Sequence, residues 1–88
     1  MILFSGKTLF KLKDQHGFPL DFAISRILDS NQVINWIEFI DTARECHWPD
    51  NKTYDIIRYA LDDCGAPLSY RTAVIAATQR YMMESLTI

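Results

Sequence analysis

Residues 50–69 have the sequence DNKTYDIIRYALDDCGAPLS, the pattern of a helix that ends in a tight turn. Apolar side chains recur at positions i, i+3, i+7 and i+10, which together form one face of an α-helix. These positions are Tyr54, Ile57, Leu61 and Cys64. Asp50 or Asn51 can cap the start of this helix, and Gly65 is placed to end it. The stretch therefore predicts a helix, a short turn and the start of another element.

A second helix is expected directly after this turn, with Ser69 as its N-cap. One stripe of this helix consists of Tyr70, Val74, Ala77 and Tyr81. The run from Ala73 to Ala77 is apolar throughout, so apolar side chains occupy more than one face. A helix that is apolar nearly all round is either central in a core or buried against a partner. Because 88 residues provide one modest core, we expect a homodimer interface on this helix. Its predicted residues are Val74, Ile75, Tyr81 and Met82.

Two further helices are expected before residue 50. Asn35 and Glu38 have the spacing of a capping box, and Pro49 would end the helix that they begin. Its apolar face comprises Trp36, Phe39, Ile40 and Ala43, with His47 at the far end. Residues 22–28 form another apolar periodic segment, for which Asp21 is the expected cap.

The first segment of the chain fits two structures. Residues 5–16 fit a helix capped by Ser5 and stopped at Gly17. The alternation over residues 10–13 also fits a strand, which would form a β-hairpin with residues 2–4. We prefer the helix because an isolated hairpin is marginally stable. The whole sequence thus predicts one all-α domain over residues 1–88, a compact bundle of four or five short helices, with the hairpin as the alternative.

Composition and charge exclude several classes of protein. The chain of 10.2 kDa is 49% hydrophobic and 23% charged, which is typical of a globular domain and not of a disordered one. The formal net charge of −2 disfavours nucleic-acid binding, although Lys7, Lys11 and Lys13 form one basic cluster. No leader or membrane segment is apparent, so we expect a cytoplasmic protein with reduced cysteines.

Motifs that carry chemistry are missing from the sequence. There is no glycine-rich phosphate loop, no GxSxG and no HExxH. Adjacent carboxylates at Asp62 and Asp63 would diverge by about 100° on a helix. The potential zinc ligands do not have a usual ligand spacing; they are His16, Cys46, His47 and Cys64. We therefore expect no enzyme, no cofactor and no metal.

One stretch resembles a known family. Residues 5–21, SGKTLFKLKDQHGFPLD, are similar to a segment of alanyl-tRNA synthetases of the form SGxxAFKLYDTYGFPLDLT. The match includes Phe10-Lys11-Leu12, Asp14 and residues 17–21, and it extends more weakly through Ile34-Asn35-Trp36 and Phe39 to cover about residues 4–47. Lys13, Gln15 and His16 stand where the family has Tyr, Thr and Tyr.

The resemblance implies an all-helical segment of the kind that helps to recognise the tRNA acceptor stem, with Asp21 matching the family's minor-groove aspartate. The class II catalytic motifs and the zinc-bearing editing motif are absent from this sequence, so aminoacylation and editing are not implied. The alternative that we prefer needs no RNA function: the Gly17-Phe18-Pro19 corner is a helix stop and restart, in which Phe18 packs onto the core.

Three functions follow from these patterns. The first is a small non-catalytic interaction or adaptor protein, dimeric through its last helix, whose partner is a protein or a second copy. The second is an RNA-binding module, similar to an acceptor-stem reader, that uses Lys7, Lys11, Lys13 and Asp21. The third is a helix-turn-helix DNA-binding accessory protein centred on residues 64–69. No membrane partner is expected.

Overall fold

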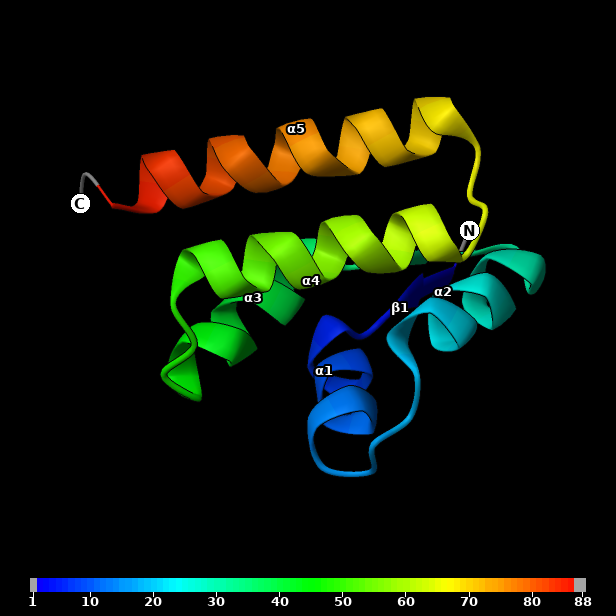
Figure 1. Cartoon of the computed structure of the whole chain (residues 1–88), viewed down its shortest axis with the longest axis horizontal. Helices are drawn as coiled ribbons and strands as arrows, with labels where there is room; N and C mark the ends of the chain where they lie inside the picture. The colour runs from blue at the N-terminus through cyan, green and yellow to red at the C-terminus, as the bar shows by residue number, and fades with distance from the viewer. Residues whose placement is uncertain (1, 87–88) are drawn as a thin grey trace.

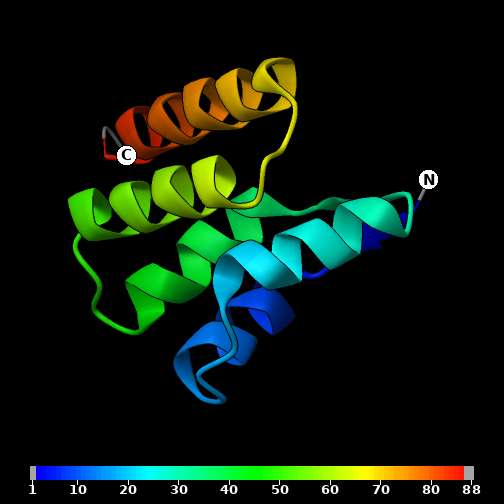
Figure 2. The same cartoon turned by 45° about the vertical axis from the view of Figure 1, so that its right-hand side comes forward.

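Five helices and one short pair of strands make up residues 2–86, the part of the chain that the computed structural model describes (Figure 1). In chain order they are β1 (Ile2–Phe4), α1 (Gly6–Asp14), α2 (Leu20–Asp29), β2 (Gln32–Ile34), α3 (Trp36–Glu45), α4 (Asp50–Asp63) and α5 (Leu68–Ser85). The predicted all-α bundle of four or five helices is therefore confirmed. The α4 and α5 helices run alongside each other in opposite directions (Figures 1 and 2). The α3 helix packs against both of them, and α1 and α2 pack against α3 and α4 respectively.

The chain is helical from residue 6, as preferred, and the alternative of a β-hairpin between residues 2–4 and 10–13 was wrong. Residues 2–4 do form a strand, and this strand pairs in parallel with β2, with Leu3 opposite Val33. Residues 10–13 belong to α1, because Phe10 and the residue before it are both buried on one helical face. Parallel strands need a long crossover connection, and here α1 and α2 together supply it.

The starts of α1 and α3 are built as one unit. The Ser5 hydroxyl accepts a hydrogen bond from the Thr8 N–H, and the Asn35 side chain accepts one from the Glu38 N–H, so both predicted caps are confirmed. The Glu38 carboxylate does not close a capping box onto Asn35. It accepts hydrogen bonds from the Ser5 hydroxyl and from the Lys7 N–H, which lies 2.9 Å away, and thereby joins α3 to the first turn of α1.

Proline occupies the N-cap position of each of the other three helices. Pro19, Pro49 and Pro67 have φ values of −59°, −63° and −55° with extended ψ, and none of these helices has a side-chain cap. The side-chain caps predicted for them are wrong, because the proline ring itself fixes the backbone at the entry to the helix. The residues concerned are Asp21 for α2, Asp50 or Asn51 for α4, and Ser69 for α5.

Residues with positive φ end several helices. Gly65 has φ of +71° and follows the C-cap of α4, and Gly17 has φ of +62° after α1, so both predicted stops are confirmed. After Gly17 the chain closes back on α1, since the Phe18 N–H donates to the Leu12 carbonyl at 2.9 Å. His47 also has positive φ, of 65°, and is exposed. Its predicted place on the apolar face of α3 is wrong, because α3 ends at Glu45 and the turn directs His47 outward.

The core is centred on contacts between aromatic rings from α1 and α3. Phe10 packs edge-to-face against Phe39, with ring centroids 5.4 Å apart, and against Trp48 at 4.9 Å. Phe39 in turn meets Trp36 at 5.6 Å. Such pairs add about 0.5–1.5 kcal/mol each beyond their area burial. The α4 helix extends this core with Ile57 and the residues of the same face, and α5 adds Val74 and Met82 while packing against both α4 and α3.

Candidate functional site

The predicted interface residues of α5 do not share one surface. Val74 and Met82 are buried and belong to the chain's own core, whereas Ile75 and Tyr81 are half-buried at its edge. The Tyr81 hydroxyl donates a 2.5 Å hydrogen bond to the Asp41 carboxylate of α3. Thr78, one residue after the predicted Ala77, is the third buried residue of α5. The inward face of α5 is therefore buried against the chain's own core and is not available to a partner.

The outward face of α5 carries small residues in its middle and large apolar residues near its ends. Thr72, Ala73, Ala76 and Ala77 are exposed. Leu68 and Met83, near the two ends, are each 69% exposed. These six residues are called the outer stripe below. Because α5 has only three buried residues in 18, most of its surface has no partner within residues 2–86.

Two open clefts border the outer stripe where α5 meets α4. The first has a volume of about 470 Å³ and includes Asp50, Tyr54 and Met83 in its lining. The second, of about 370 Å³, includes Leu68, Ile75 and Ala76. Gln79 lines both clefts, so they form one groove along the α4–α5 hairpin, which is called the hairpin groove below.

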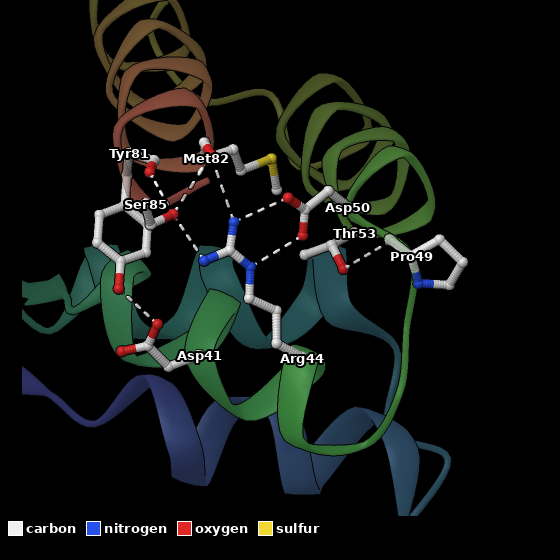
Figure 3. Close-up of polar contacts among 8 residues, drawn as sticks. All are labelled: Asp41, Arg44, Pro49, Asp50, Thr53, Tyr81, Met82 and Ser85. Atoms are coloured by element: carbon white, nitrogen blue, oxygen red, sulfur yellow. Dashed lines mark hydrogen bonds and ion pairs between the residues drawn. The ribbon is translucent and has the colours of Figure 1, made fainter. Parts of the chain in front are cut away.

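A cluster of polar contacts around Arg44 holds one end of this groove together (Figure 3). The Arg44 guanidinium donates two hydrogen bonds to Asp50, of 3.0 and 2.8 Å, and one of 2.7 Å to the Ser85 hydroxyl. It also lies 5.6 Å from the centre of the Tyr81 ring. One side chain at the end of α3 thus ties the first turn of α4 to the last turn of α5. These groups satisfy one another and serve to fix the hairpin.

The Arg44–Asp50 pair predicts a loss of stability in acid. Hydrogen bonding from Arg44 lowers the pKa of Asp50, and a hydrogen bond from Ser5 lowers that of Glu38. A carboxylate with a lowered folded-state pKa contributes stability that is fully present above its unfolded value, about 4. That stability is lost as the pH falls through the pKa of the carboxylate in the folded state.

We therefore expect the urea midpoint to hold from pH 7 to about pH 5 and then to fall below pH 4. In Asp50→Asn, part of this fall should disappear, with a loss of about 1 kcal/mol at pH 7 because the pair is partly solvated. The control is Asp55→Asn, an exposed carboxylate on the same helix. Equal pH profiles for wild type and Asp50→Asn would contradict the expectation.

The residues predicted to bind RNA do not converge. Lys7 and Lys11 are exposed and lie one turn apart on the same face of α1. Lys13 follows Lys11 by two residues, or about 200° around the helix, and therefore points to the opposite side. Asp21 is partly buried in the first turn of α2. The structure thus places two of the four residues together.

The turn between α4 and α5 has the geometry of an αα-hairpin. In a helix-turn-helix the two helices meet at about 90–120°, whereas α4 and α5 lie side by side and run in opposite directions (Figures 1 and 2). Arg71 also donates to the Ala66 carbonyl at 3.0 Å and to the Asp62 carboxylate at 2.9 Å. A basic side chain at the start of α5 is therefore held against the end of α4.

The structure also has an apolar pocket that the sequence did not predict. This pocket of about 300 Å³ lies where α1, α2 and β1 meet, and it is called the corner pocket below. Its lining includes Phe4, Leu12, Phe18, Phe22, Arg26 and Ile27. Phe18 was expected to pack onto the core, and Phe22 was expected only to begin an apolar periodic helix. They are 38% and 48% exposed, and their rings are 5.5 Å apart. The only feature of the sequence that pointed to this pocket was the pair of phenylalanines four positions apart, Phe18 and Phe22.

Two features of residues 2–86 bear on metal binding and on membrane insertion: the grouping of ligating side chains and the length of apolar helices. No group of three or more His, Cys, Asp or Glu side chains there is arranged to hold a metal ion. No helix in the same range is both long enough and apolar enough to cross a membrane.

Comparison of the chain with known proteins gives no match to a family model, to a curated protein or to a solved structure.

Proposed function

We propose that the chain is a small, non-catalytic interaction protein that associates with a second copy through its α4–α5 hairpin. The observation that carries this proposal is the outer stripe, which the longest helix leaves uncovered and which has a large exposed apolar residue near each end. Two αα-hairpins that pack face to face make a four-helix bundle, a common way to bury such surfaces.

The shape of the outer stripe suits self-association. Small residues let two helix backbones approach closely, and the midpoint of α5 lies between Ala76 and Ala77. Two α5 helices that cross antiparallel at this point would bring the same patch of each copy together, as a two-fold interface requires. Stable interfaces bury about 1,000 Å² or more in total, so Leu68 and Met83 must be covered as well as the alanines.

The charges at the two ends of the hairpin are complementary in this arrangement. Arg80 and Asp63 have no ion-pair partner among residues 2–86. In an antiparallel crossing, Arg80 of each copy would lie opposite Ala73 of the other. The carboxylates at the end of α4, which Arg71 places beside this part of α5, would then be near that arginine. A parallel crossing would bring the two Arg80 side chains together instead.

The dimer is tested by Ala76→Arg, which places a long charged side chain at the centre of the outer stripe. Sedimentation equilibrium at high micromolar concentration should give about 20.4 kDa for the wild type, which is twice 10.2 kDa. The variant should give 10.2 kDa with an unchanged helical circular dichroism spectrum, since residue 76 is exposed.

The matched control is Gln15→Arg, which adds the same side chain at an exposed position after α1. This variant should remain dimeric. A wild-type mass of 10.2 kDa at the same concentration would overturn the proposal, and so would a dimer that survives Ala76→Arg.

A further inference from the structure

The corner pocket is part of a larger apolar surface. Phe4 lines the pocket from β1. Ile2 lies two residues before Phe4 on the same side of the strand, since side chains alternate between the faces of a sheet. Ile2 is 67% exposed. The exposed apolar area thus runs from the Phe18–Phe22 ring pair across the pocket to the strand, which is more than a small molecule of pocket size would cover.

A single positive charge stands at the mouth of this pocket. The Arg26 guanidinium lies 5.8 Å from the centre of the Phe22 ring, one turn away on α2. No carboxylate of residues 2–86 lies within ion-pair distance of it. An exposed arginine stacked on an aromatic ring is held in place while its hydrogen-bond donors stay available. The pocket therefore presents an apolar floor beside an unpaired cation.

The strand beside the pocket has an open edge. The two-stranded sheet has the order β1–β2, so β1 is paired on one side only. The Phe4 carbonyl accepts from the Asn35 N–H on the β2 side, at 3.0 Å. Backbone groups of successive residues point to opposite edges of a strand, so the Leu3 N–H and C=O point away from β2. An unpaired edge of this kind is a template for another strand.

We propose that the corner pocket and the open edge of β1 bind an extended peptide segment of a partner protein. The peptide would pair with the Leu3 backbone, place a bulky apolar side chain in the pocket, and present an Asp or Glu within two residues of it to Arg26. Main-chain hydrogen bonds then supply affinity, while the pocket and the cation supply specificity, as in other cases of strand addition. This site is separate from the hairpin groove and does not depend on the dimer.

The test uses the full chain, immobilised and exposed to a phage library of random heptapeptides. We expect the enriched peptides to share a bulky apolar residue with Asp or Glu within two positions. The best of them is then synthesised with a fluorescent label, and its affinity is measured by anisotropy. Phe22→Ala should weaken binding by at least about tenfold. The Leu3 amide should gain protection from hydrogen exchange when the peptide binds.

A charge swap tests the role of Arg26. Arg26→Glu should weaken binding of the acidic peptide, and replacing the acidic residue of the peptide by lysine should restore it. The matched control is Lys52→Glu on α4, which reverses the charge of another exposed cation stacked on an aromatic ring, that of Trp48, and should leave the affinity unaltered. Failure to enrich any peptide, or binding that is unaffected by both Phe22→Ala and Arg26→Glu, would overturn the proposal. The monomeric Ala76→Arg variant should still bind, so the dimer and the peptide site are tested separately.

Discussion

Replacement of Phe39 by alanine is expected to cause the largest loss of stability of any substitution proposed for this chain. Phe39 is fully buried and contacts the rings of both Phe10 and Trp36. Truncation of a buried phenylalanine costs about 3–5 kcal/mol. A domain of this length has a total stability of about 4–13 kcal/mol. The expected loss is therefore a large part of the whole.

Urea unfolding followed by circular dichroism measures this loss. Ile37→Ala is the matched control, because it truncates a large apolar side chain on the same helix where 51% of the residue is exposed. We expect the control to change stability by no more than about 0.5 kcal/mol. A loss below about 2 kcal/mol for Phe39→Ala would show that the ring cluster is not the centre of the core.

Gly6→Ala is the second change with a large expected effect, although it adds only a methyl group. A Cβ atom at Gly6 would lie 2.0 Å from the Asn35 carbonyl oxygen and 2.4 Å from the Phe39 nitrogen. Both are backbone atoms of α3 or its cap and cannot rotate away. The α1 helix must therefore move off α3, and we expect a loss of at least about 3 kcal/mol, the upper end of the usual range for overpacking.

Two other glycines separate this effect from the general cost of replacing glycine. Gly17 and Gly65 have positive φ, but a Cβ at either position would meet no atom within 4 Å. Alanine there should cost about 1–2 kcal/mol, from backbone strain alone. If Gly6→Ala proved no more destabilising than these two in urea unfolding, the close contact of α1 with α3 would be contradicted.

Features that depend on neighbouring residues were predictable from the sequence. Ser5 and Asn35 cap their helices through hydrogen bonds to a residue three positions later. Gly17 and Gly65 end helices because they adopt a left-handed conformation that other residues disfavour. These contacts are local, so the sequence contains both partners within a few positions. The number of helices could be predicted because these local signals mark where several of the helices begin or end.

Features that join distant residues were not predictable in this way. The strand at residues 2–4 finds its partner 30 positions later, and no periodic pattern specifies that pairing. The Glu38 carboxylate likewise accepts a hydrogen bond from Ser5 and not from the Asn35 backbone that begins its own helix. On α5, apolar residues surround the helix, so periodicity could not show which of them face inward. Val74 and Met82 turned out to be core residues, and the outer stripe could be identified only once the position of α4 was known.

The parallel pairing of β1 with β2 also has a consequence for the order of folding. Joining Leu3 to Val33 closes a loop of 30 residues, for which the entropy cost is on the order of 3 kcal/mol. During synthesis, residues 2–4 emerge well before residues 32–34 exist to receive them. Helical turns form in about a microsecond or less, so α1 and α2 can form before the strands meet. The β1 strand, although it is made before both helices, is therefore expected to reach its final position after them.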